Sequence, residues 1–201
     1  MYTHQKSFQW DVVYMQKHKL LPHIIQGGMG VGVSSPKLAN IVSRHGQLGV
    51  ISGTAVALTL ARKLMDGDLD GCIREVLQDF PFPKISQKII DKYYDPNPKD
   101  PLKDRYKQVP MPSLDQSKDL TDLTVVACYV EVKLAKKGHD GIIGMNLLEK
   151  LQIPTLPSLY GAILADVDYI LMGAGIPIRI PAVLDLLSEH QDCKLPIKIA
   201  E

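Results

Sequence analysis

PHIIQGGMGVGVSSPKLANIVSRHGQLGVISGT, residues 22–54, is the stretch that determines the fold class. It begins with a short apolar run that ends in glycines, which is typical of a buried strand followed by a tight loop. Ser35 before Pro36 is typical of a helix N-cap with proline at the first helical position, and Gly46 is placed to end that helix. A second apolar run, residues 48–52, again ends in small residues. This order predicts a βαβ unit whose sheet is parallel and covered by helices.

The helix expected over residues 35–46 carries an apolar stripe. Leu38, Ile41, Val42 and His45 fall on one helical face, which is the pattern of an amphipathic helix.

Similar units follow along the chain. Residues 141–145 and 169–172 predict a third and a fourth strand, and residues 195–200 predict the start of a fifth. Helices are expected over residues 156–165 and 180–190. Because short connections between parallel strands are right-handed and seldom cross, we expect the strands to be adjacent and parallel.

The connection between the second and third strands, residues 55–138, is longer than an ordinary crossover. Helical patterns cover residues 56–66, 69–79 and 84–94, and a further apolar element over 120–137 is closed by Gly138. Between them lies the proline- and charge-rich segment 95–117, and an unstructured loop of that length usually marks a lid or cover.

Composition excludes several classes of protein. With 201 residues, of which 45% are hydrophobic, the chain is expected to form one globular domain. Its 23 Lys and Arg against 22 Asp and Glu give no electrostatic reason to expect nucleic acid or an anionic membrane as a partner. No apolar run approaches the ~20 residues that span a bilayer, and the first residues lack the apolar core of a signal peptide.

Cys72, Cys128 and Cys193 are widely spaced and form no metal-binding pattern, which fits ordinary thiols in the cytoplasm.

Candidate binding residues lie where the predicted strands end. Three of the four complete strands end in glycines or other small residues, and the other ends at Met145-Asn146. Ligands of α/β folds bind at the carboxyl ends of strands, and glycine lets the backbone approach a phosphate or a cofactor ring, although tight turns alone would also explain these glycines. A Rossmann site is disfavoured, because Gly28-x-Gly30 is followed by Val33 where the third glycine belongs, and because residues 52–54 include no acidic residue.

Taken in order, these motifs resemble nitronate monooxygenase, formerly called 2-nitropropane dioxygenase. The resemblance is carried by IIQGGMG at 24–30, QLGVISGT at 47–54, GMN at 144–146 and LMGAGIP at 171–177, together with the helix between the first two. It runs from about residue 10 to the end of the chain. The related FMN-dependent enoyl-acyl-carrier-protein reductases share the same loops.

The resemblance implies an FMN-dependent TIM barrel that oxidises alkyl nitronates with dioxygen. Gly27, Gly28 and Met29 match the first-strand loop that packs on the flavin. Asn146 matches an asparagine that follows the third strand and hydrogen-bonds FMN, although it could equally make an Asx-turn. Gly173 matches a position where the backbone lines the pocket.

The barrel expected from the resemblance is incomplete. A (β/α)8 barrel has eight strands over ~250 residues, so residues 1–201 correspond to one truncated FMN-binding domain of about four to five βα units, with residues 55–138 as an extended helical crossover. The family carries its catalytic histidine and the glycine-rich loops for the FMN phosphate on later strands, which have no equivalent here. His23, His45, His139 and His190 are expected at the opposite end of the barrel.

The catalytic residues therefore stay unassigned, and we expect no nitronate turnover by this chain alone. The side chains expected at the active edge are not convincing bases near neutral pH. They are Met29, Ser34, Ser52, Thr54, Asn146 and Met172.

Two other functions are compatible with the same motifs. One is an enoyl-reductase-like enzyme with the same cofactor. The other is a non-catalytic remnant, or a subunit that completes its barrel with another chain. The expected partners are accordingly a small-molecule substrate, a second copy of this chain, or a complementary carboxyl-terminal chain.

Overall fold

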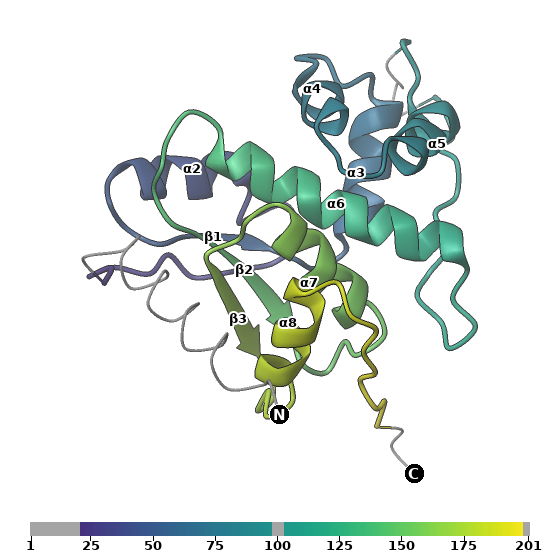
Figure 1. Cartoon of the computed structure of the whole chain (residues 1–201). Helices are drawn as coiled ribbons and strands as arrows, with labels where there is room; N and C mark the ends of the chain where they lie inside the picture. The colour runs from purple at the N-terminus through teal and green to yellow at the C-terminus, as the bar shows by residue number, and fades with distance from the viewer. Residues whose placement is uncertain (1–20, 98–102, 199–201) are drawn as a thin grey trace.

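A computed structural model describes residues 21–97 and 103–198, and shows a mixed α/β fold with a parallel three-stranded sheet. Figure 1 shows the arrangement of its elements. In chain order they are α2 (Pro36–Arg44), β1 (Gly49–Ser52), α3 (Val56–Met65), α4 (Cys72–Gln78), α5 (Pro83–Tyr93), α6 (Lys118–Lys136), β2 (Ile143–Leu148), α7 (Thr155–Leu164), β3 (Tyr169–Gly173) and α8 (Ile180–Ser188).

The sheet confirms the predicted second, third and fourth strands. Its order is β1-β2-β3, and both neighbouring pairs are parallel. The register places Ser52 opposite Asn146, and Asn146 opposite Leu171. The carboxyl ends of all three strands therefore meet at one edge of the sheet.

The predicted first strand is present only as an isolated bridge. Ile25 pairs with Leu48 in the parallel sense, and the N–H of Gln26 donates to the carbonyl of Leu48 at 3.0 Å. The strand goes no further because the N–H of Val50 donates to the side-chain Oε1 of Gln26 at 3.0 Å, instead of to a backbone carbonyl. The prediction for residues 22–26 was thus correct in position and direction, and wrong in extent.

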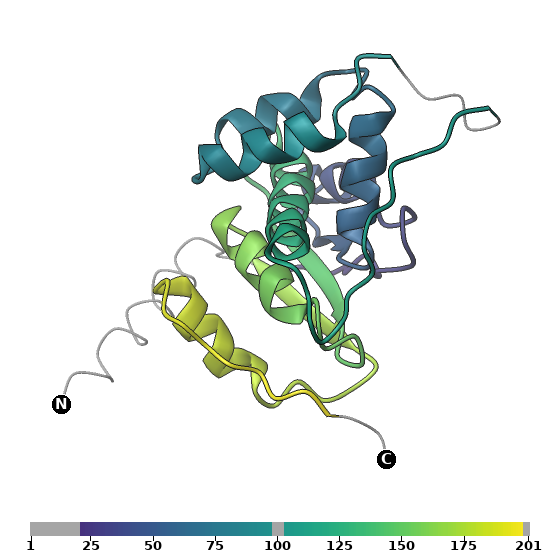
Figure 2. The same cartoon turned by 90° about the vertical axis from the view of Figure 1, so that its right-hand side faces the viewer.

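The predicted fifth strand is absent from residues 195–198 of the described chain. Here the backbone of Lys198 bonds to the side chain of Gln152, with its N–H donating to Oε1 at 2.6 Å and its carbonyl accepting from Nε2 at 3.2 Å. In Figure 2 this segment runs back along α8. The last three residues lie outside the described part.

The third strand is longer than predicted. β2 continues to Leu148, because the ladder with β3 extends until Leu148 lies opposite Gly173. Asn146 therefore lies inside a strand and does not follow one. Asparagine is a poor strand former, so sequence reasoning ended the strand too early.

The helix boundaries agree well with the sequence. Ser35 caps α2 by accepting a hydrogen bond from the N–H of Leu38 at 3.3 Å. Gly46 and Gly138, predicted as helix ends, have φ angles of +73° and +76°. The crossover consists of α3, α4, α5 and α6, as predicted, and its described residues between α5 and α6 form neither helix nor strand.

Helices pack against one face of the sheet. Side chains alternate along β2, so Met145 and Leu147 enter a large core shared with α3, α6, α7 and α8. On the other face, Leu48 and Val50 form a small separate cluster with neighbouring strand residues, and none of its members belongs to a helix. α6 and α7 lie side by side across the covered face in both views (Figure 1, Figure 2).

The apolar stripe of α2 does not face this core. Leu38 and Ile41 are 37% and 48% exposed, whereas Ala39 and Ser43 are buried. The reason is close backbone packing, since a Cβ placed on Gly49 would collide with the carbonyl of Ala39. Small residues of α2 therefore turn towards β1 and the large ones turn outward.

No helix among the residues described combines the length and the apolar character needed to cross a membrane.

The contact between α6 and α7 gives a first prediction. Gly161 lies inside α7, and a Cβ there would collide with the backbone carbonyl of Val125 and approach the Cβ of Cys128 to 3.0 Å. Replacing glycine by alanine at a solvent-exposed position inside a helix stabilises the protein by about 1 kcal/mol. Gly161→Ala should instead destabilise by about 1–3 kcal/mol, because the two helices must separate.

Urea unfolding followed by circular dichroism measures this change. Gly30→Ala is the matched control, because a Cβ at Gly30 has no atom within 4 Å, and its effect should stay within about 1 kcal/mol. A Gly161→Ala protein at least as stable as the original would contradict the packing described here.

Candidate functional site

The candidate site lies at the edge where the three strands end. A Cβ placed on Gly28 would collide with the Cβ of Asn146 and lie 2.7 Å from its Cγ. A Cβ placed on Gly173 would lie 4.0 Å from Nδ2 of the same asparagine. Three residues predicted to bind the cofactor, from separate parts of the sequence, are thus neighbours around one amide.

Ser34 holds the glycine-rich loop in shape. Its buried hydroxyl accepts a hydrogen bond from the N–H of Met29 at 2.8 Å and donates to the carbonyl of Gly27 at 3.1 Å. Its own carbonyl accepts from the N–H of Ser52 at 3.0 Å, which ties the loop to β1. Gln26 adds a bond from Nε2 to the carbonyl of Gly27 at 2.6 Å.

The loop leaves part of its backbone accessible. A Cβ on Gly27 would have no atom within 4 Å, and Met29 is 59% exposed. The loop's left-handed glycine is Gly32, with φ +73°, and the group directly against Gly28 is Asn146. Gly28 therefore positions Asn146.

The amide of Asn146 bonds across the sheet. Its Nδ2 donates to the carbonyl of Leu171 on β3 at 3.4 Å, and its backbone carbonyl accepts from the N–H of Gly53 at 2.8 Å. The Asx-turn interpretation is therefore wrong, because the side chain does not bond to the backbone of the following residues. Within the described chain, the side-chain Oδ1 has no hydrogen-bond donor.

Glu149 adds a carboxylate to this edge. It occupies the turn after β2, where its N–H donates to the carbonyl of Gly173 at 2.8 Å. Its side chain is half-buried against the loop that follows β3, with Oε2 2.5 Å from a Cβ placed on Gly175. Sequence reasoning missed this residue because it ended the strand at residue 145. The signal that could have identified it is the continuation of the alternating pattern through Leu147.

The histidines at 45, 139 and 190, all in the described part of the chain, lie away from this edge. The ring of His139 is held just before β2, with Nε2 2.8 Å from the carbonyl of Ala135 and Nδ1 accepting from the N–H of Gly141 at 3.0 Å. His45 is the C-cap of α2, and His190 follows the end of α8 with its Nδ1 3.1 Å from the hydroxyl of Tyr160. These positions at helix ends and strand starts agree with the predicted placement opposite the carboxyl ends of the strands.

The cysteines are poor candidates for nucleophiles. Burial raises the pKa of the Cys128 thiol to about 12, and it also raises the pKa values of Cys72 and Cys193. A higher pKa leaves less of the reactive thiolate at neutral pH. All three thiols are free, and residues 21–97 and 103–198 hold no group of three or more potential metal ligands.

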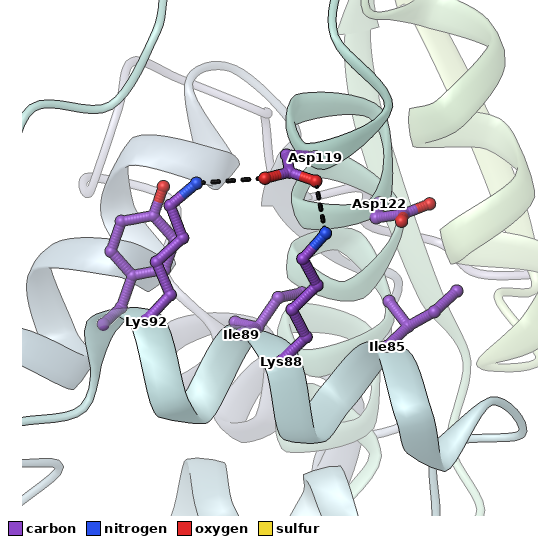
Figure 3. Close-up of a pocket in the computed structure, with 7 residues that line it drawn as sticks. Ile85, Lys88, Ile89, Lys92, Asp119 and Asp122 are labelled. Carbon is purple, nitrogen blue, oxygen red and sulfur yellow. Dashed lines mark hydrogen bonds and ion pairs between the residues drawn. The ribbon is translucent and has the colours of Figure 1, made fainter.

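A hollow between α5 and α6 is distinct from the strand ends (Figure 3). Lys88 and Lys92 reach from α5 to the two carboxylate oxygens of Asp119 on α6, at 2.6 and 3.2 Å. These hydrogen bonds lower the pKa of Asp119, and Asp119 in turn raises the pKa of Lys88. These ion pairs join two crossover helices, so we assign the hollow a structural role.

Comparisons of the chain with protein-family models, curated proteins and solved structures gave no match.

The contact between Gly28 and Asn146 gives a second prediction. Gly28→Ala should destabilise the protein by about 1–3 kcal/mol, because the new methyl group overlaps the asparagine side chain. In an Asn146→Gly background the same change should cost less than about 0.5 kcal/mol, because the overlap is gone. Urea unfolding of the four proteins in this double-mutant cycle measures the coupling. Equal costs in the two backgrounds would show that the loop does not pack on Asn146.

Proposed function

We propose that this chain is the amino-terminal, FMN-binding part of a (β/α) barrel oxidoreductase that resembles nitronate monooxygenases and acts on alkyl nitronates. The observation that carries the proposal is the gathering of Gly28, Asn146 and Gly173 at the carboxyl edge of a parallel sheet. That edge is where the loops of α/β folds bind ligands.

The residues at the edge suit a flavin. The Oδ1 of Asn146 has no donor among the described residues, so the amide has hydrogen-bonding capacity for a polar ring edge. Gly27 presents backbone that no side chain covers, and the exposed Met29 beside it can pack on a flat ring. Gly173 contributes backbone on the far side of Asn146. When bound, FMN supplies the redox chemistry, and the protein supplies position and electrostatics.

The sheet also suits part of a barrel. In a (β/α)8 barrel the helices cover the outside, and side chains of the strands fill the interior. Here the large core lies between strands and helices, and the opposite face carries a small apolar cluster around Leu48, Val50 and Leu171. That cluster corresponds to the start of a barrel interior, which further strands would complete. Free thiols throughout the described chain favour a cytoplasmic location.

Flavin titration tests the proposal. We expect FMN fluorescence to be quenched on addition of the protein, and Asn146→Ala to weaken binding by about tenfold, the effect of losing one hydrogen bond of about 1–1.5 kcal/mol. Asn97→Ala, an exposed asparagine in the crossover, is the matched control and should leave the affinity unchanged.

Two results would count against the proposal. One is the absence of FMN binding up to about 1 mM, and the other is an equal affinity in the Asn146→Ala and original proteins. If FMN binds, nitronate oxidation compared with enoyl-thioester reduction distinguishes the two enzyme classes. Binding without either activity would favour a subunit that needs a complementary chain.

A further inference from the structure

The sheet is open at both edges. At one edge lies β3, which pairs with β2 and has no second neighbouring strand among the described residues. The carbonyl of Gly173 accepts a hydrogen bond from the N–H of Glu149 at 2.8 Å, so Gly173 directs its backbone groups towards β2. Because these groups alternate in direction from one residue to the next, Ile170 and Met172 direct theirs away from β2. The outer side of β3 is therefore available to pair with another strand.

At the other edge lies the first-strand segment, residues 22–26. The carbonyl of Ile24 accepts a hydrogen bond from the N–H of Leu48 at 3.1 Å, and the N–H of Gln26 donates to the carbonyl of Leu48 at 3.0 Å. Ile25, between them, therefore directs its N–H and its carbonyl to the side away from Leu48. The bridge to Leu48 is parallel, as is the pairing of β1, β2 and β3, so the two open edges run in the same direction.

The position of α8 shows where a strand is missing. A helix that follows a parallel strand normally leads to a further strand in the same sheet. Ile180, Val183 and Leu187 of α8 enter the core, and Figure 2 shows α6, α7 and α8 side by side in that order. The helix layer therefore continues past β3, whereas residues 195–198 form no strand. Within the described part of the chain, the sheet position next to β3 is unfilled.

The chain itself carries a segment that suits this position. Leu21, Ile24 and Ile25 are 78%, 62% and 56% exposed at the first edge, and burying them would stabilise a contact. The first-strand segment and the three strands of the sheet are parallel, so two chains supply the eight strands of a closed barrel. The formal net charge of +1 leaves little repulsion between copies. These features favour a second copy over an unrelated partner.

We propose that two copies of this chain associate edge to edge, with residues 22–26 of each copy pairing in parallel with β3 of the other. Half a turn about an axis along the strands makes the same contact twice and closes the ring, which leaves no open edge. The carboxyl ends of all the strands then surround one mouth, which includes Asn146 of both copies. This inference rests on the barrel fold of the proposed function and does not require its cofactor.

Sedimentation equilibrium of the full chain tests the dimer. At about 100 µM we expect a species of two chains, against 22.3 kDa for one chain. Ile25→Pro should raise the dissociation constant of the dimer by about tenfold or more, because proline removes the N–H that points to the other copy. Ile25→Val keeps that N–H and is the matched control, with an affinity close to that of the original protein. Since the bonds to Leu48 use Ile24 and Gln26, each single chain should keep its fold, which circular dichroism measures.

Ile25→Lys is the second probe if Ile25→Pro alters the circular dichroism spectrum, because a lysine on an exposed edge blocks strand pairing. A dimer weakened by either change and not by Ile25→Val supports the proposal. A monomer at every concentration, a dimer that neither change weakens, or a series of larger species overturns it. So does a monomer that assembles only with the carboxyl-terminal half of a nitronate monooxygenase.

FMN titration of the same samples separates this inference from the proposed function. A monomer that binds FMN overturns the dimer and leaves the proposed function standing. A dimer that depends on Ile25 and does not bind FMN supports the edge contact and contradicts the proposed function alone.

Discussion

The parallel sheet depends on close backbone contact with its helices. No hairpin joins its strands, so each connection runs through a helix that must pack tightly on the sheet or on another helix. Two glycines make this possible, Gly49 beneath Ala39 of α2 and Gly161 against Val125 of α6. Tight packing at these points aligns the strands and brings their carboxyl ends to a common edge.

The two ends of the sheet have different chemistry. At the amino end, Asp168 accepts a hydrogen bond from the N–H of Ile143 at 2.8 Å and forms an ion pair with Lys136 at 2.9 Å. These two contacts hold β2, β3 and α6 together. At the carboxyl end, Asn146 and Glu149 retain unused hydrogen-bonding capacity within the described chain.

Local signals made much of the fold predictable, and non-local contacts account for what was missed. Ser35, Gly46 and Gly138 gave helix boundaries because capping acts over a few residues. The outward turn of α2 could not be predicted, since it depends on Gly49 in another element. The extent of β2 was also missed, because pairing with β1 and β3 keeps Asn146 in a strand, and that error hid Glu149. The neighbouring positions of Gly28, Asn146 and Gly173 followed from strand order, whereas the packing of Gly28 on Asn146 required the structure.

The long crossover has a consequence for the order of assembly. Pairing β1 with β2 must close a chain roughly four times as long as the one between β2 and β3, which costs about 1 kcal/mol more in loop entropy. The β2–α7–β3 unit is therefore the part of the sheet that chain entropy favours first. Docking of β1, together with the glycine-rich loop attached to it through Ser34, then becomes the late step that completes the edge where the three strands end.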